Sequence, residues 1–168
     1  MYEEEDFNYF AESLTSDNSK DRGYALGHLT AIDVKGDERL LPLLEPLLQD
    51  EHIVKMPAMP PNYCEIRWLA AKAIETQRYL LKLPPQKISR LGFVYPGSSG
   101  EMSVFAEERH GIKSSDLPKF FSTPEEPYGH IIAELEYLKT LNALPVCTMS
   151  ERPYIDYSTL PQDEDDEY

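Results

Sequence analysis

The chain has 168 residues, of which 41% are hydrophobic and 27% charged, and its formal net charge is -14. This composition is typical of a folded chain with one modest core and excludes a fully disordered one. The sequence shows neither a secretion signal nor the run of roughly 18 apolar residues that a membrane-spanning helix needs. We therefore expect a soluble, cytoplasmic protein whose two cysteines, Cys64 and Cys147, are reduced thiols.

Apolar residues at helical spacing predict a first helix over residues 7–14 and a second over about 19–32. The turn and N-cap residues 15–19 separate the two. On the second helix we expect four side chains to face the core: Tyr24, Ala25, Leu29 and Ile32. Gly36 suits a left-handed cap at the break that follows.

The third predicted helix, about residues 38–49, is rich in leucine and has only a narrow polar strip, so it must be buried on more than one side. Pro46 is internal to it and should bend it. Residues 50–63 contain three prolines and predict an extended or looped insertion. A strong helical signal follows over about 64–83, with an inward face made of Ile66, Leu69, Ala70, Ala73, Ile74 and Leu80.

The second half of the chain is less regular. Residues 87–94 could form a short helix or a strand, residues 95–100 predict a loop, and residues 114–121 predict one or two helical turns. A last helix is expected from Thr123 or Glu125 to Asn142, with five inward residues: Ile131, Ile132, Leu135, Leu138 and Leu141. The chain thus divides into one helical domain, 1–144, and an acidic, extended tail, 145–168.

An offset of 45 residues aligns the second predicted helix with the fourth. Arg22 falls on Arg67, Ala25 on Ala70 and Leu29 on Ile74. A period of this length with paired helices is typical of HEAT and armadillo arrays, in which each helical hairpin buries its apolar face against a neighbour. The period predicts two stacked helical units.

The stretch 17–50 resembles the HEAT-repeat family, in particular its short bacterial form. It has an Asp-rich turn, a first helix with Arg and small residues, a Gly-Asp turn and a second helix of the Leu-Pro-Leu-Leu type. Residues 65–74 match the first helix again, whereas residues 85–93 do not match the second. The resemblance, over roughly residues 17–83, implies an all-α fold: a short α-α superhelix of HEAT-like hairpins with a long irregular insertion. It implies a binding scaffold more than any one activity.

Candidate catalytic and metal-binding residues form no recognised set. His28, His52, His110 and His130 show no metal-ligand spacing with each other or with the cysteines, so we predict no metal and no cofactor. The loop 97–100 lacks the spacing of a nucleophile elbow, and residues 107–110 suit a solvated charged turn as well as acid-base chemistry. Trp68, the only tryptophan, is expected to be partly buried rather than to contact a partner.

The distribution of charge points to a protein partner. Residues 1–20 contain six acids and one lysine, and residues 151–168 contain seven acids and one arginine, so the two ends hold -11 of the -14. Such a field attracts basic protein surfaces and repels nucleic acid and anionic lipid. We therefore expect a protein partner with a basic surface, and neither direct nucleic-acid binding nor a membrane. The acidic ends could also serve only solubility.

We predict a protein-binding module, not an enzyme, that neutralises or regulates its partner, as an immunity or antitoxin-like protein neutralises a basic toxin. One alternative is a HEAT-like lyase or accessory enzyme acting on a protein substrate through residues 92–113; another is an acidic mimic of DNA. The oligomeric state stays open. The candidate partner-binding residues lie on the Leu-rich helix, after residue 92 and in the tail: Glu38, Arg39, Glu45, Glu107, Glu108, Tyr154, Asp156, Tyr157, Asp163, Glu164, Asp165, Asp166 and Glu167.

Overall fold

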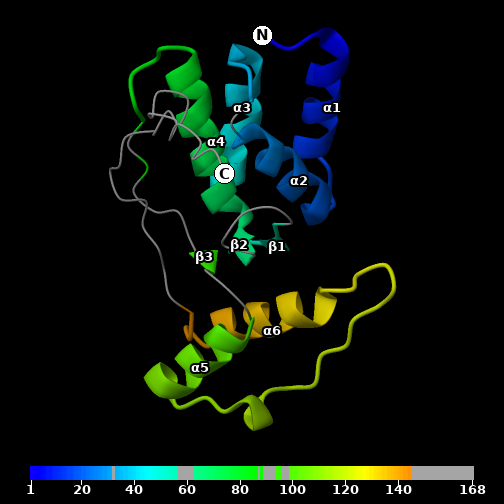
Figure 1. The fold of residues 1–168 in the computed structure, drawn as a ribbon, viewed down its shortest axis with the longest axis vertical. Helices are drawn as coiled ribbons and strands as arrows, with labels where there is room; N and C mark the ends of the chain where they lie inside the picture. Colours follow the sequence, from blue (N-terminus) through cyan, green and yellow to red (C-terminus); the bar gives the residue numbers. More distant parts are fainter. Residues whose placement is uncertain (32, 57–62, 87, 89–93, 96–98, 145–168) are drawn as a thin grey trace, which may run out of the picture.

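The structure, a computed structural model, describes the chain except for residues 32, 57–62, 87, 89–93, 96–98 and 145–168. It is mostly helical, as the sequence predicts, and a small antiparallel sheet lies between two groups of helices (Figure 1). The helices are α1 (Glu4–Leu14), α2 (Ser19–Leu29), α3 (Leu41–Leu44), α4 (Ile66–Leu80), α5 (Ser99–His110) and α6 (Gly129–Thr140), and the strands are β1 (Ile53–Lys55), β2 (Tyr63–Glu65) and β3 (Val94–Tyr95).

Helices α1 to α4 surround the larger hydrophobic cluster. Helix α2 packs against both α1 and α4, and α3 packs against α4. The residues aligned by the 45-residue offset are buried on both helices, Ala25 and Leu29 on α2 and Ala70 and Ile74 on α4. The repeated pattern therefore marks the buried faces of two helices that touch each other.

The Leu-rich segment is not one regular helix. Two 3-10 turns, η1 (Glu38–Leu40) and η2 (Glu45–Gln49), flank the single α-helical turn of α3. Pro46 lies in η2, so the expected irregularity occurs there, since proline lacks the N–H that a regular turn would use. Burial on more than one side is confirmed: Leu40, Leu44 and Leu47 are buried, and Leu41, Leu43 and Leu48 are half-buried against the same cluster.

The sheet was not predicted, and it corrects an all-α assignment. Its strand order is β1-β2-β3, and Val54 pairs with Cys64 in the centre of the β1-β2 ladder. Because successive side chains of a strand point to opposite faces, Val54 and Cys64 enter the larger cluster, whereas Ile53 and Tyr63 join a smaller one beneath α6. The sheet is therefore shared by two cores.

Helix α5 is a second correction. The sequence predicts a loop at 95–100 and allows a charged turn at 107–110, whereas a helix runs from Ser99 to His110. Its apolar residues are adjacent in sequence rather than at helical spacing, which hides the period. Within this helix Ala106 is buried in the smaller cluster, and Phe105 is half-buried against it.

Helix α6 begins later than the sequence predicts. The Thr123 hydroxyl does accept a hydrogen bond from the Glu126 N–H, 3.1 Å away, as a helix cap would. Pro127 follows at once, and a residue before proline is displaced from the helical region. The capped turn therefore stops, and the helix starts at Gly129.

Three individual expectations were wrong. Tyr24 is 47% exposed, and Leu26 is buried on α2 in its place; Leu141 lies beyond the end of α6 and is 45% exposed. Gly36 does not have a positive φ. A Cβ at Gly36 would lie 3.0 Å from the Leu80 Cβ, so the absence of a side chain permits a close approach between the loop and α4.

Within the described ranges, none of the helices has the length and the apolar character needed to cross a bilayer.

Candidate functional site

The predicted partner-binding residues lie at separate places on the molecule. Glu38 and Glu45 are exposed beside α3, and Glu107 and Glu108 are exposed on α5. The predicted residues of the tail, Tyr154, Asp156, Tyr157 and 163–167, lie outside the described residues. Glu107 and Glu108 therefore lie on a different element from Glu38 and Glu45.

Arg39 is engaged within the chain. Its guanidinium makes ion pairs with Asp37 at 2.8 Å and with Glu4 at 2.9 Å, donates to the carbonyl of Tyr2, and lies 4.0 Å from the centre of the Phe7 ring. These contacts tie α1 to the start of the Leu-rich segment. The side chain that the sequence offered as a surface contact thus joins two elements of the fold.

Asp37 is the centre of this junction. Its carboxylate is 1% exposed and accepts the N–H groups of Tyr2 and Arg39, while its own N–H donates to the Gln77 side chain on α4 at 2.8 Å. The hydrogen bond from the Arg39 side chain is the main reason why the pKa of Asp37 falls to about 2. The charged carboxylate of Asp37 therefore fixes Arg39, which pairs with Glu4 of α1, while the backbone N–H of Asp37 makes the contact with α4.

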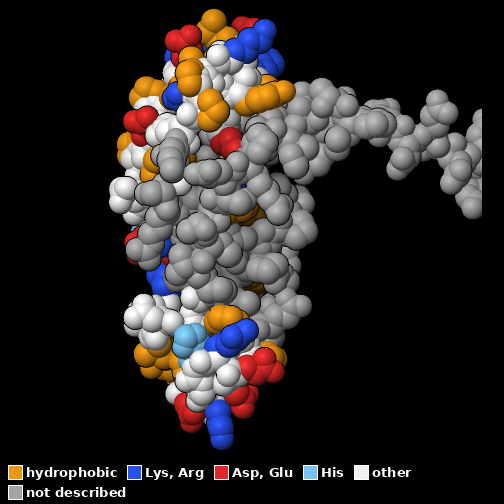
Figure 2. Space-filling view, turned by 90° about the vertical axis from the view of Figure 1, so that its left-hand side faces the viewer, with side chains coloured by type: hydrophobic (Ala, Val, Ile, Leu, Met, Phe, Trp, Pro, Cys, Tyr) orange, Lys and Arg blue, Asp and Glu red, His pale blue; other side chains and the backbone are white. Residues whose placement is uncertain are grey.

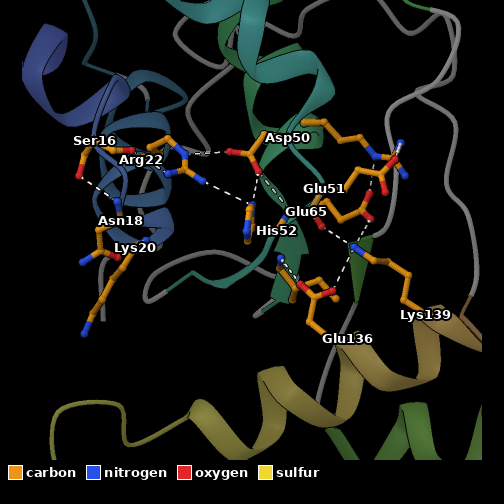
Figure 3. Close-up of polar contacts among 12 residues, drawn as sticks. Ser16, Asn18, Lys20, Arg22, Asp50, Glu51, His52, Glu65, Glu136 and Lys139 are labelled. Carbon is orange, nitrogen blue, oxygen red and sulfur yellow. Dashed lines mark hydrogen bonds and ion pairs between the residues drawn. The ribbon is translucent and has the colours of Figure 1, made fainter.

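A second polar group lies where α2 meets the end of η2 (Figure 3). Arg22 Nε is 2.8 Å from Asp50 Oδ2, Arg22 Nη1 donates to the Ser16 carbonyl, and His52 Nδ1 is 2.7 Å from Asp50 Oδ1. Burial by itself raises the pKa of Asp50, but hydrogen bonds from His52 and Arg22 outweigh burial and lower it. The His52 imidazole is 66% exposed and faces solvent, whereas the Asp50 side chain is only 11% exposed.

The third polar group joins α4, β2 and α6. The Arg67 guanidinium pairs with Glu65 and Glu51, and Lys139 Nζ lies 3.3 Å from Glu65 Oε1 and 3.1 Å from Glu136 Oε2 (Figure 3). The Glu65 side chain is 0% exposed and Lys139 only 18%. A buried carboxylate of this kind depends on its cations, because an unpaired buried charge is costly.

The two aligned arginines meet at adjacent residues. Arg22 of α2 binds the side chain of Asp50, whereas Arg67 of α4 donates its N–H to the Asp50 carbonyl and its guanidinium to Glu51. The sequence offset aligned the two arginines but could not show that they bind the adjacent acids Asp50 and Glu51, because these acids lie in the segment between the two aligned helices.

The described residues offer little for catalysis by a nucleophile or a metal. Burial raises the pKa of the Cys64 thiol to about 12, so the thiolate that would act as a nucleophile is scarce. Among the described residues, His, Cys, Asp and Glu side chains do not gather in threes suited to a metal ion. Trp68 is half-buried against the larger cluster, as expected, with Lys72 Nζ 4.8 Å from the centre of its ring.

The exposed surface of residues 1–51 has a marked excess of acids. The exposed bases of this stretch are Lys20 and Lys35, whereas its arginines are buried or half-buried in ion pairs. The exposed acids are Glu3, Glu4, Glu5, Asp6, Glu12, Asp17, Asp21, Asp33, Glu38, Glu45 and Glu51. On the face drawn in Figure 2, the side of α4, acidic and basic side chains are instead interspersed at both ends of the molecule.

Comparison of the chain with protein-family models, with curated proteins and with solved structures gave no match.

Proposed function

We propose that this chain is a protein-binding module that recognises a basic surface on a protein partner and neutralises or regulates that partner, as an immunity or antitoxin-like protein does. The observation that carries the proposal is the acid excess on the exposed surface of residues 1–51. Opposite charges on two surfaces steer their encounter and raise the association rate.

The acids of α1 are arranged on one face of an ordered helix. Glu5, Tyr9 and Glu12 are spaced four and three residues apart, which places them on the same side of α1, and all three are exposed. Tyr9 is 52% exposed. An aromatic residue flanked by acids suits a partner surface that presents Lys or Arg, because tyrosine anchors are frequent at interfaces and acids supply the charge complement.

We further propose that the scaffold is a degenerate pair of HEAT-like units. The buried, equivalent positions of α2 and α4, and the convergence of Arg22 and Arg67 on Asp50 and Glu51, support two related units packed side by side. Such arrays serve as binding scaffolds, because each unit leaves one face free. The scaffold therefore agrees with binding as the main activity.

A specific observation also favours a second candidate, the acidic mimic of DNA. Mimicry requires acids held on a rigid surface, and those of α1 and α2 are held on helices. A partner of this kind would itself bind nucleic acid. Competition separates the two candidates, because duplex DNA would displace the chain from a nucleic-acid-binding partner and leave other complexes intact.

Affinity capture from the host with the full chain tests the proposal, with captured proteins identified by mass spectrometry at low and at moderate salt. The test variant is Glu5→Lys/Glu12→Lys on α1, and the matched control is Glu125→Lys/Glu126→Lys at two exposed acids before α6, which changes the net charge equally. We expect one basic protein to be retained by the wild type and by the control, and to be lost from the α1 variant and in salt.

Retention of the same partner by both variants at moderate salt would contradict acid-directed binding through α1. Loss of the partner from the control alone would move the contact to the other end of the molecule.

A further inference from the structure

The outer face of α1 carries a stripe of three exposed side chains. Helix α1 turns Phe10 and Leu14 toward the larger cluster. On the opposite side of the helix lie Glu5, Tyr9 and Glu12, which are exposed. Figure 1 shows α1 at the margin of the group formed by α1 to α4, with the other three helices on one side of it. The stripe is therefore open to a partner.

The spacing of the stripe matches the contact line between two packed helices. Glu5, Tyr9 and Glu12 are separated by four and three residues, the alternation found along the seam where two helices pack at a small angle. From its first to its last residue the stripe rises about 10 Å, since each helical residue adds about 1.5 Å. A second helix laid along α1 would present its own side chains at the same intervals.

Tyr9 gives the stripe an ordered aromatic centre. Its ring lies edge-on to the Phe10 ring at 5.5 Å, and the Phe10 ring lies 5.0 Å from that of Tyr2. Tyr2 is fixed in turn, because its hydroxyl accepts the N–H of Lys35 and its own N–H donates to the Asp37 carboxylate. The Tyr9 side chain, although 52% exposed, thus rests on a row of anchored rings. An aromatic side chain held in this way loses little entropy when a partner covers it.

The charge at the C-terminal end of α1 is not balanced within the helix. Glu12 lies near this end, where the helix dipole already places partial negative charge and where the last turn of α1 contains no basic residue. Asp17 is exposed just beyond the helix. An acid at this end lowers the stability of a helix. A cation supplied by a partner would interact favourably with Glu12 and with the helix end together.

Helix α1 is fixed at both ends, so it offers a rigid surface. At its start Glu4 pairs with Arg39 at 2.9 Å, and after its end the Ser16 hydroxyl donates to Asp21 of α2 at 2.8 Å. Its inner face adds the apolar contacts of the larger cluster. Because α1 stays in place, a partner must fit the stripe as it stands, and a second helix has the matching spacing.

We infer that the partner contributes an α-helix that packs lengthwise on the outer face of α1. This helix places an apolar side chain against the Tyr9 ring and a Lys or Arg beside each of Glu5 and Glu12, so its two cations lie seven residues apart. It continues outward the packing of α1 on α2 and of α2 on α4. The inference rests on the proposed function, since it assumes a basic partner, and it names the element that the partner contributes.

The test uses the full chain and three labelled peptides as probes. The stripe peptide repeats Leu-Ala-Gln-Lys-Ala-Ala-Gln three times, which places leucine and lysine on one side of a helix at the required spacing. The proline peptide has proline in place of the alanine after each lysine, so it keeps the charge but cannot form the helix. The glutamate peptide has glutamate in place of each lysine.

Two variants with matched controls locate the contact. Tyr9→Ala removes the aromatic centre, and its control is Tyr128→Ala, at a tyrosine before α6 that is 44% exposed. Glu12→Gln removes the charge near the end of α1, and Glu126→Gln makes the same change at another exposed acid. Glu12→Gln should raise the thermal unfolding midpoint by about 1–3 °C while it weakens binding. A residue with only a structural role would instead lose stability together with binding.

We expect the stripe peptide to bind the wild type and both controls with similar affinity, and to bind Tyr9→Ala about tenfold more weakly. Glu12→Gln should bind it about threefold more weakly, as loss of one exposed ion pair implies. The proline and glutamate peptides should bind the wild type at least about tenfold more weakly than the stripe peptide does. With the stripe peptide bound, hydrogen exchange should slow in α1 and stay unchanged in α6.

Equal binding of the stripe and proline peptides would overturn docking of a helix and leave the proposed attraction to basic partners intact. Undiminished binding by Tyr9→Ala would also overturn it, and so would faster exchange in α1, because the helix would then be displaced rather than covered. If neither basic peptide bound in preference to the glutamate peptide, both this inference and the proposed function would fail. If Tyr9→Ala did not fold, Glu12→Gln and the wild-type exchange comparison would decide.

Discussion

The group of helices α1 to α4 and the pair α5 and α6 share one small sheet but are held by different forces. The cluster within the first group contains sixteen buried residues of the described chain, whereas the cluster beneath α6 contains seven. The second group relies in addition on charged contacts from Glu136 and Lys139. Since apolar burial is the main stabilising contribution, the first group should unfold last and the second should open first.

The largest expected effect separates the two groups by their cores. Leu26→Ala should lower the global free energy of unfolding by about 2–5 kcal/mol, because Leu26 is fully buried in the larger cluster. Leu135→Ala should speed hydrogen exchange in α6 and leave the slowest amides of α4 unchanged. Urea unfolding with exchange measurements checks both. Equal loss of α4 protection in the two variants would show that the groups form one cooperative unit.

The next effect concerns the acid at the centre of the first group. Asp37→Asn should lower the free energy of unfolding by about 1–3 kcal/mol at pH 7, because it weakens the charged hydrogen bonds of the carboxylate. The Asp37 side chain is only 1% exposed. The pKa of Asp37 is lowered from 3.8 to about 2, so its contribution is complete above pH 4 and is lost as the pH falls through 2.

Urea unfolding at several pH values is the measurement, and Asp33→Asn, at an exposed acid, is the control. The stabilities of the wild type and of Asp37→Asn should converge as the pH approaches 2. A difference that stays constant down to that pH would assign the loss to packing rather than to charge.

A smaller effect tests how closely β1 packs on the first group. A Cβ at Gly23 of α2 would meet three side-chain atoms of Val54 at 3.0–3.2 Å, whereas a Cβ at Gly27 would meet mainly the terminal methyl of Met56. Gly23→Ala should therefore lower the free energy of unfolding by about 1–2 kcal/mol. Gly27→Ala should lie within about 1 kcal/mol of the wild type, since Met56 can move and alanine favours the helix. Thermal unfolding of the pair distinguishes them, and equal losses would mean that β1 adapts to the added methyl.

The smallest expected effect is an absence of change at Cys64. Its side chain belongs to the larger cluster, and burial raises its pKa to about 12. In a Cys147→Ser background, thiol labelling of Cys64 should be at least about a hundredfold slower than that of an exposed cysteine. Lys139→Met should leave this rate unaltered, because opening of α6 does not uncover the other face of the sheet. Faster labelling in Lys139→Met would show that the two cores open together.

Local pattern predicted much of the first group and little of the second. The helices at 19–29 and 66–80 have apolar residues at helical spacing, so their existence and most of their buried positions could be read directly from the sequence. Helix α5 lacks that spacing, and the strands are only two or three residues long, too short for an alternating pattern to stand out. These elements exist because neighbours distant in the sequence cover them.

The polar contacts show the same division. The sequence indicated that Arg22 and Arg67 occupy equivalent places, because an offset of the chain against itself aligns them. It did not indicate that Arg39 makes contacts within the fold, because its partner Glu4 lies 35 residues away. Nor did it indicate the contacts of Glu136 with Ile53 and of Lys139 with Glu51, which span 83 and 88 residues. Pairings across such separations leave no local signature.

The sequence by itself determined a mostly helical chain with strongly acidic ends, because helical spacing and composition act over a few residues and need no knowledge of the rest of the fold. The tertiary structure alone decided that a small sheet lies between two cores and that Glu136 of α6 accepts the N–H of Ile53 in β1. Backbone groups must find donors and acceptors wherever the folded chain brings them, and that choice is made in space rather than along the sequence.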